Sequence, residues 1–518
     1  MRSLTLDDSI ALIPIFSALV ILVRLTHARL LRRYWGESFK ATLTLGVLGI
    51  WLSWGLPHLT AISLGVWCLL YLSPALLRVQ LKRSVWRSDY QGASRWAHRL
   101  YWLSPSREMR YLQQIYQLMD AMTQGEVRQP SDLDHLKRET PRLWQTAIAQ
   151  LYALSHQWED LLTFLKTPDR GVTLGDQLWT RPYLIRALGE TQKLGDLIRV
   201  SLEYLPQKPH HDDWSVEMML SAFLGDSETL ALILNGPLKM IHTDYKRYWF
   251  AVATQAQGDI ASSRAQLRSL TEHTSLKVVR QAGLKRLDLT PRPIPQQAHQ
   301  VAEWIRSGLR VAHYERPNRI AWSSWTLLSL IVVTYLWEER QGGSRDIRVL
   351  YELGAMWTES VSLGEWWRLW TANFLHFGLL HLSLNAICLI WISRVVERHL
   401  GMLKHLLLWL IVGPLAMGSL ALLMHVHVLS PQLLLGASVI LMALIGFEMM
   451  TQYAHWRTTH HPIAYRQLRI LVSIVVAQSC VDLIIEQVSF SGHLAGLLWG
   501  ITLGLISTHT ERESSSAR

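Results

Sequence analysis

Three polar stretches inside apolar surroundings decide the fold of the C-terminal part of this sequence. They are HFGLLHLSLN at residues 376–385, GAS at 436–438 and GHLAG at 492–496. Each stretch places a hydroxyl, amide or imidazole next to a run of residues apolar enough to enter a bilayer. Polar and ionisable groups are costly there, so such positions are first treated as functional. We therefore consider the three stretches as parts of one site.

The first stretch carries two hydrogen-bond donors on one helix face. His381 and Asn385 are four residues apart, a spacing that brings their side chains to the same side of a helix. Two donors at one depth can hold an oxyanion. A plainer interpretation is that the pair only makes hydrogen bonds between helices. Both interpretations stay open for the pair taken alone.

The other two stretches supply a hydroxyl and an imidazole. Ser438 taken alone is a weak candidate for a nucleophile, because a serine in a membrane helix usually bonds back to its own backbone. His493 begins a run in which Gly496, Gly500 and Gly504 recur every four residues. Glycines at that spacing make a groove that another helix can approach closely. A helix in that groove could bring a serine within hydrogen-bond reach of His493.

Long apolar runs predict a membrane protein of nine crossings. A crossing needs about 20 apolar residues. Six predicted spans lie near residues 320–337, 373–395, 404–428, 432–450, 468–486 and 493–508. Three more are predicted before them, one at 9–23 and two within 41–77. Lysine and arginine follow the ends that we place inside, which puts residues 85–318 in the cytoplasm and the N-terminus outside.

The composition excludes several classes of protein. Charged residues make up 18% of the 518 residues and hydrophobic residues 49%, so a disordered chain is excluded. Lysine plus arginine exceed the acids by 11, but the excess lies beside the predicted spans and predicts no nucleic-acid partner. Cys68, Cys388 and Cys480 form no disulfide framework or zinc site. The stretch HHDD at 210–213 is interpreted as a solvated loop, so we expect no metal and no cofactor.

The water-soluble middle is predicted to be helical, with apolar residues recurring three and four apart. Gly-Asp pairs at 195–196, 225–226 and 258–259 suggest helices that stop at a left-handed glycine and restart at an aspartate cap. Residues 251–265 resemble one hairpin of the tetratricopeptide repeat, whose period is about 34 residues. Two interpretations remain open, a solenoid that docks a protein partner and a helical domain with no groove.

Taken together, the motifs of the C-terminal part resemble the rhomboid intramembrane serine proteases over about residues 317–510. The resemblance rests on EWWRLWT at 365–371, the stretch 376–385, Glu397-x-x-x-Gly401, Gly436-Ala-Ser438, ALIG at 443–446, Asp482 and GHLAG at 492–496. It implies an all-α polytopic membrane protein with a six-span rhomboid-like bundle. The expected domains are three N-terminal spans in 1–84, a repeat domain in 85–316, the bundle in 317–510 and a polar tail in 511–518.

The resemblance also implies a reaction and residue roles. Ser438 would be the nucleophile and His493 its base, with no acid as a third member, and His381, Asn385 and the Ser438 backbone N–H would stabilise the oxyanion. Structural roles are implied for Trp367, Arg368, His376, Glu397, Gly401, Gly436, Asp482, Gly496 and Gly500. The expected substrates are transmembrane helices of client proteins in a bacterial inner membrane, cleaved at a site that opens to the outer side.

Two positions depart from the family pattern. Val439 follows the serine where the family has glycine or another small residue, and Met442 stands where an aromatic side chain usually packs on the histidine. The branched Val439 side chain could crowd the scissile bond. The alternative function is a catalytically silent rhomboid-like protein that binds membrane clients and recruits partners through its helical repeats. A transporter is disfavoured because no charged pathway crosses the spans.

Overall fold

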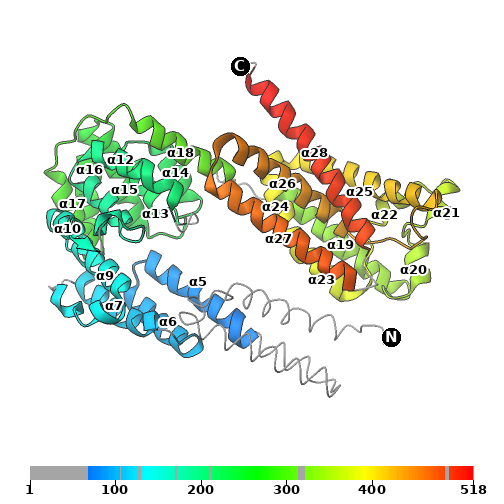
Figure 1. Cartoon of the computed structure of the whole chain (residues 1–518), viewed down its shortest axis with the longest axis horizontal. Coiled ribbons are helices and arrows are strands. Elements are labelled where there is room, and N and C mark those ends of the chain that lie inside the picture. The colour runs from blue at the N-terminus through cyan, green and yellow to red at the C-terminus, as the bar shows by residue number, and fades with distance from the viewer. Residues whose placement is uncertain are drawn as a thin grey trace. The chain divides into compact units, whose positions relative to one another are not determined.

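The computed structural model describes residues 68–105, 107–124, 130–169, 172–208, 213–312, 321–484 and 489–516. This part of the chain is almost entirely helical (Figure 1), which confirms the expected all-α class. The predicted spans at 9–23 and in most of 41–77, and the histidines of the HHDD stretch, lie outside the described residues. The chain divides into two compact units between Ile305 and Arg306.

The first unit is a succession of short helices joined by tight turns, with one two-stranded hairpin. Its elements are η1 (Cys68–Leu72), α5 (Ser73–Trp86), α6 (Tyr90–Leu103), α7 (Arg107–Thr123), η2 (Pro130–Leu133), α8 (Leu136–Glu139), α9 (Pro141–Leu154), α10 (Trp158–Leu165), β1 (Pro168–Asp169), β2 (Val172–Thr173), η3 (Leu174–Asp176), α11 (Arg181–Glu190), α12 (Leu194–Tyr204), η4 (Leu205–Gln207), α13 (Ser215–Phe223), α14 (Ser227–Asn235), α15 (Thr243–Ala256), α16 (Ile260–His273) and α17 (Lys277–Leu287). Helix α18 (Ala298–Val311) spans the division between the units.

Residues in the left-handed conformation mark the turns inside successive helix pairs. They are His156 (φ 56°), Gln192 (φ 55°), Gly225 (φ 72°) and Gly258 (φ 92°). These residues lie between α9 and α10, α11 and α12, α13 and α14, and α15 and α16. Their spacing along the chain is 36, 33 and 33 residues. The first unit therefore contains helical hairpins that recur every 33 to 36 residues.

Two of the three Gly-Asp pairs form the predicted turn. Gly225 and Gly258 are left-handed, and the aspartate after each caps the next helix. Asp226 accepts a hydrogen bond from the backbone N–H three residues later at 3.1 Å, and Asp259 does the same at 3.0 Å. These contacts satisfy one of the N–H groups that a helix start leaves without an intrahelical partner.

The prediction for the third pair was wrong. Helix α12 begins at Leu194, so Gly195 and Asp196 lie inside its first turn. The left-handed position of this turn is Gln192, three residues earlier, and Lys193 takes the N-cap position. A non-glycine residue can adopt the left-handed conformation at a modest cost in free energy. This turn therefore did not need the left-handed glycine that we predicted. Asp196 instead places its charge near the positive end of the helix.

A later segment of the chain, residues 277–295, contacts three of the four left-handed residues. Near its start, a backbone carbonyl lies 3.1 Å from Nε2 of His156. Further along, a backbone N–H donates to the side chain of Gln192 at 2.9 Å, and an isoleucine side chain lies against Gly225. At these three turns the edge of the hairpins is therefore occupied by the chain itself. Burial of the His156 ring lowers its pKa to about 4, so the imidazole is neutral at pH 7.

A buried charged cluster joins the hairpins to α17. The Glu190 carboxylate accepts hydrogen bonds from Arg186 and Arg286, both at 2.8 Å, and from the Tyr248 hydroxyl at 3.2 Å. Glu190 and Arg286 are each 5% exposed. Burial favours the neutral acid, but the two guanidinium groups outweigh it and hold the pKa of Glu190 below its usual value.

Removing one partner of this cluster should destabilise the first unit. Arg286→Met leaves the buried Glu190 carboxylate with a single arginine, which we expect to cost about 3 kcal/mol. Hydrogen exchange of the α11 and α17 amides in the full chain would then speed up by roughly a hundredfold. Arg199→Met is the matched control, because Arg199 is 63% exposed and pairs only with surface acids. Equal exchange in the two variants would contradict the prediction.

The second unit is a bundle of longer helices. Its elements are α19 (Trp322–Arg340), α20 (Ile347–Glu352), α21 (Thr358–Ser362), α22 (Arg368–Thr371), α23 (Gly378–Cys388), η5 (Leu389–Ser393), α24 (Arg394–Leu400), α25 (Met402–His425), α26 (Ser438–Thr459), α27 (Pro462–Ile484) and α28 (Phe490–Ser516). Among the described residues, two helical segments are long and apolar enough to cross a membrane, Met402–His425 and Phe490–Thr510. They overlap two of the six spans predicted for this part of the chain; the other four predicted spans do not meet the same test.

Helix α26 is the centre of the bundle. Every residue from Val439 to Glu448 is buried, so this helix is covered on all sides, as expected of a central helix. Helix α28, drawn in red in Figure 1, packs along it. The contact is made by the glycines of α28 against backbone carbonyls of α26. The matching positions are Gly496 on Val439, Gly500 on Ala443 and Gly504 on Phe447.

Candidate active site

An extended segment leads into α26 and places Ser438 at its first position. Leu434 pairs with Met356 through two backbone hydrogen bonds of 2.9 and 3.0 Å, and the Gly436 N–H donates to the carbonyl of Ala372 at 2.8 Å. These contacts fix the path of the chain just before the serine. The first N–H groups of a helix have no intrahelical partner and form its positive end. Ser438 therefore combines a half-buried hydroxyl with an electropositive backbone.

Gly436 makes room for the imidazole of His381 beside Ser438. Its φ of 114° is unfavourable for any residue with a Cβ. A Cβ at this position would lie 2.7 Å from Cε1 and 3.0 Å from Nε2 of His381, and 3.7 Å from Oγ of Ser438. The His381 ring and the serine hydroxyl thus border the same small space above Gly436.

The hydrogen bonds of His381 indicate which of its nitrogens carries the proton. The backbone N–H of Phe377 donates to Nδ1 of His381 at 3.4 Å. An accepting Nδ1 leaves the proton on Nε2, the nitrogen that faces Gly436. The ring of His376 packs edge-on against His381, with ring centres 5.2 Å apart. His381 is therefore held as a donor directed at the space beside Ser438.

Asn385 lies one helical turn after His381 on α23. It is 6% exposed, and its amide nitrogen Nδ2 is buried without a hydrogen-bond partner among the described residues. An unpaired buried donor is unfavourable, so such groups are uncommon in folded proteins. The Asn385 amide therefore has a hydrogen-bond donor that the described residues leave unused.

His493 lies in the first turn of α28 and is held by a buried acid. Its Nδ1 is 2.7 Å from Oδ2 of Asp482, and the other oxygen of Asp482 accepts a hydrogen bond from Gln478 at 2.7 Å. The side chains of His493 and Asp482 are 8% and 1% exposed. The resemblance implied a base without an acid partner and a structural role for Asp482. In the structure, α27 brings the Asp482 carboxylate into contact with the His493 imidazole.

Helix packing brings His493 to the level of Ser438. Gly492 and Gly496, which flank His493, both lie against Val439, the residue after the serine. Among the described residues, no hydrogen bond joins Ser438 to His493. Hydrogen bonds between catalytic groups are often long in enzymes that have no substrate bound. The helices that carry the serine and the histidine therefore pack against each other through the glycines of α28.

Val439 and Met442, the two residues that depart from the family pattern, lie in the core. Val439 is 4% exposed and belongs to an apolar cluster with Met356, Leu369 and residues of α25, and Met442 is 6% exposed. A side chain buried to this extent is not available to crowd a client. Val439→Gly would therefore leave a cavity in the bundle.

Several residues with implied structural roles brace the loop before α23. The guanidinium of Arg368 donates to the backbone carbonyls of Tyr351 at 2.6 Å and Ala355 at 2.9 Å and pairs with Glu365. The ring of Trp367 covers Gly354 so closely that a Cβ there would overlap it. Side-chain contacts to backbone carbonyls therefore hold this loop together.

Glu397 ties α24 to the start of α19. Its carboxylate accepts hydrogen bonds from the backbone N–H groups of Ser323 at 3.0 Å and Ser324 at 2.9 Å, and from the Ser324 hydroxyl at 2.7 Å. Gly401 has a φ of 84° and joins α24 to α25. Glu397 therefore joins two helices that are distant in the sequence, whereas Gly401 sets the turn between two consecutive helices.

Glu338 is a site residue that the sequence reasoning missed. The predicted span ends at residue 337, so Glu338 is expected in the loop that follows it. Helix α19 continues to Arg340, so Glu338 is fully buried and accepts the backbone N–H of His376 at 3.1 Å. Gln478 was also missed, and its only sequence signal is the four-residue spacing from Asp482. Neither contact is visible before the helices are packed.

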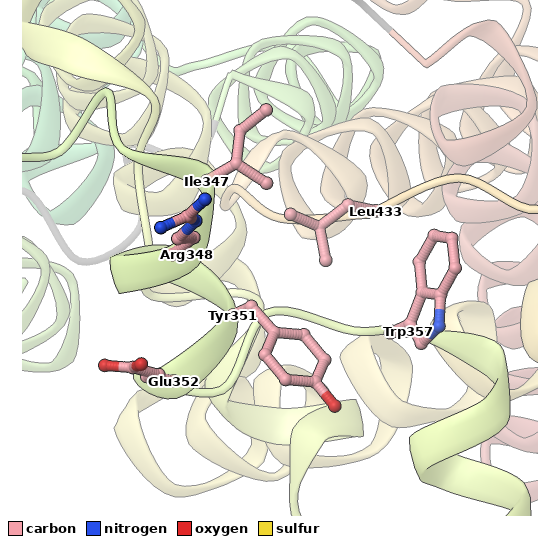
Figure 2. A pocket seen from close by; sticks show the side chains of 6 residues that line it. All are labelled: Ile347, Arg348, Tyr351, Glu352, Trp357 and Leu433. Atoms are coloured by element: carbon pink, nitrogen blue, oxygen red, sulfur yellow. The ribbon is translucent and has the colours of Figure 1, made fainter.

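A pocket of about 380 Å³ lies beside the segment that enters α26. Its walls are mostly apolar, and Figure 2 shows Leu433 together with the rings of Tyr351 and Trp357. Arg348 and Glu352 of α20 add one charge of each sign. Leu433 comes shortly before Ser438 in the sequence, so a group in this pocket would touch the segment that positions the serine.

The orphaned donor of Asn385 leads to a test of the oxyanion site. Asn385→Ala removes a group that can bond the tetrahedral oxygen, and turnover should fall on the order of 10²–10³-fold with the fold intact. Ser383→Ala is the matched control on the same helix, because that hydroxyl bonds only back to Leu379 at 2.7 Å. Cleavage of a model transmembrane client measures both. Unchanged turnover in Asn385→Ala would assign the amide to packing alone.

Comparison with known proteins agrees with this geometry. A family model described as Rhomboid domain matches residues 363–510. Over 177 residues the chain is 27% identical to Rhomboid protease GluP of Bacillus subtilis, covering 34% of this chain and 33% of that protein. It is 30% identical over 161 residues to RHOMBOID-like protein 5 of Arabidopsis thaliana, covering 31% and 50%. Over 184 residues it is 25% identical to Rhomboid-type serine protease B of Aspergillus fumigatus, covering 35% and 65%.

These matches confirm the family resemblance that the motifs carried, and they concern the C-terminal part only. The chain spans between a third and two thirds of the length of the relatives just named. The likeness of the first unit to tetratricopeptide repeats stays a prediction. The chain therefore carries a rhomboid domain at residues 363–510 and is a homologue of the rhomboid proteases.

Proposed function

We propose that this protein is an intramembrane serine protease that cleaves transmembrane helices of client proteins. The observation that carries the proposal is the arrangement around Ser438. The hydroxyl stands at the positive end of α26 beside the donor nitrogen of His381, and the glycine groove brings in His493, which a buried acid holds. A nucleophile, a base and oxyanion donors gathered at one place are what acyl transfer requires.

The proposed reaction has two stages. His493 Nε2 takes the proton of the Ser438 hydroxyl while Oγ attacks the scissile carbonyl carbon, and the C–N bond then breaks as His493 returns the proton to the leaving amine. Water, activated by the same histidine, hydrolyses the acyl-enzyme and restores Ser438. In both stages the developing oxyanion accepts hydrogen bonds from His381, Asn385 and the backbone N–H of Ser438, each worth on the order of 10²–10³ in rate.

The proposal includes the surroundings of the site. We infer an integral membrane protein with a six-span bundle in residues 317–510, three earlier spans in 1–84 and a polar tail in 511–518. The helical hairpins of 85–316 would lie in the cytoplasm of a bacterial cell, with the site opening to the outer side of the inner membrane. Their period of 33 to 36 residues supports a tetratricopeptide-like module that holds a protein partner on a face other than the edge of the three covered turns.

The experiment that tests the protease is labelling and cleavage of the purified full chain in detergent. A serine-directed fluorophosphonate should label the wild type, and a model transmembrane client should be cut. Ser438→Ala should abolish both signals, because the attacking oxygen is gone. Labelling that persists in Ser438→Ala would show that another residue reacts.

A second candidate function is favoured by Met442, which stands where the family has an aromatic side chain, and by the absence of a hydrogen bond between Ser438 and His493 among the described residues. In this case the protein binds membrane clients without cutting them and recruits partners through its hairpins. A folded wild type that neither labels nor cleaves, yet pulls down a transmembrane client, would favour this function over the protease.

A further inference from the structure

We propose that Asp482 is a positioning residue that sets the tautomer and orientation of the His493 imidazole. Its effect on catalysis rests on the protease function proposed above, whereas its effect on the histidine does not. The motif resemblance implied a serine and a histidine working alone. The structure assigns an acid to the far side of the base, so the working unit has three members.

The contacts of Asp482 leave its carboxylate with one defined arrangement. One oxygen accepts the Gln478 amide at 2.7 Å and the other lies 2.7 Å from Nδ1 of His493. The Asp482 side chain is 1% exposed, so water does not compete for these lone pairs. Gln478 and Asp482 are one helical turn apart on α27, and the amide therefore holds the carboxylate in the orientation that meets α28.

A carboxylate at Nδ1 has a specific chemical consequence for the histidine. The carboxylate only accepts, so Nδ1 must carry a proton and donate it. The lone pair of the neutral ring then lies on Nε2, the nitrogen that must take the proton of Ser438. When His493 becomes an imidazolium, the buried carboxylate of Asp482 stabilises it.

Asp482→Asn tests this role because it keeps the shape of the side chain. The asparagine amide can donate to Nδ1, which moves the ring proton to Nε2 and leaves no lone pair facing the serine. We expect fluorophosphonate labelling to slow by about 10³–10⁴-fold, the size of effect known for the equivalent change in serine protease triads. Asp482→Glu keeps a carboxylate and should retain labelling within about tenfold of the wild type.

The chain offers a matched control in Glu448→Gln. Glu448 is 2% exposed and accepts the amide of Gln452, one turn away, at 2.7 Å. The pair of Glu448 and Gln452 thus resembles the buried pair of Asp482 and Gln478. It lies on α26, ten residues after Ser438. The variant should label at the wild-type rate. If Glu448→Gln loses labelling as strongly as Asp482→Asn, the loss follows from changing any buried acid in the bundle. That result would overturn the positioning role of Asp482.

A spectroscopic readout separates this inference from the protease function. In full-length protein labelled with ¹⁵N-histidine, the His493 signals are assigned by their loss in His493→Ala. The wild type should show a protonated Nδ1, and Asp482→Asn a protonated Nε2. A wild-type ring protonated on Nε2 overturns the positioning role, even if the variant does not fold. If both tautomers are as expected but the fluorophosphonate labels neither the wild type nor any variant, the role of Asp482 is supported and the protease function is rejected.

Discussion

Replacing His493 with alanine is expected to reduce cleavage of a model transmembrane client by a factor on the order of 10⁴–10⁶. A serine hydroxyl is a weak nucleophile without a base, and removing the base alone costs about as much as removing a whole triad. In this protein the imidazole is buried, bonded to Asp482 at 2.7 Å and carried on the helix that packs against the start of α26. Few other groups of the site could take its place.

The measurement needs a histidine control and a check of the fold. His425→Ala is suitable, because His425 is exposed at the end of α25 and lies outside the proposed machinery. Cleavage and fluorophosphonate labelling should stay at the wild-type level in His425→Ala and fall together in His493→Ala. Folded His493→Ala protein that still cuts the client would show that another group acts as the base.

Gly500→Val is expected to abolish the packed bundle. A Cβ at Gly500 would overlap the backbone carbonyl of Ala443, and backbone atoms cannot rotate away as a side-chain tip can. Overpacking of a core usually costs 1–3 kcal/mol, and here the two central helices must separate along their length, so we expect a loss of more than about 3 kcal/mol. The same separation would withdraw His493 from Ser438.

Thermal unfolding in detergent, followed by the fraction of protein that stays monodisperse, measures this effect. Gly418→Ala is the matched control, because an added Cβ on α25 would meet only the Leu369 side chain at 3.8 Å, an ordinary contact. Gly418→Ala should unfold at the wild-type temperature, whereas Gly500→Val should yield little folded protein. Wild-type stability of Gly500→Val would mean that α26 and α28 do not pack through these glycines.

Much of the candidate site could be predicted from local spacing. The four-residue separation of His381 and Asn385 puts both on α23 and on one face, because a helix repeats its direction at that distance. The glycines of α28 recur at the same interval and form one continuous groove. The aspartate caps after Gly225 and Gly258 depend on a single turn of chain, and they too were predictable.

Contacts between helices could not be predicted in this way. Gln192 replaced the expected Gly195 at its turn because several residue types tolerate the left-handed conformation when the neighbouring helices hold it. Glu338 looked like a loop acid because hydropathy registers where an apolar run ends, and not where a helix ends. In each case the deciding energy comes from packing partners that are far apart in the sequence.

By itself, the amino-acid sequence determined the helical class, the order of the motifs and the residues that can carry acyl-transfer chemistry. These properties follow from interactions within one or two helical turns. Only the tertiary structure decided that the glycine groove holds the helix of Ser438 and that Asp482 meets His493. The physical reason is that side-chain spacing fixes the faces of a helix, whereas the partner of each face is chosen by the close packing of the whole bundle.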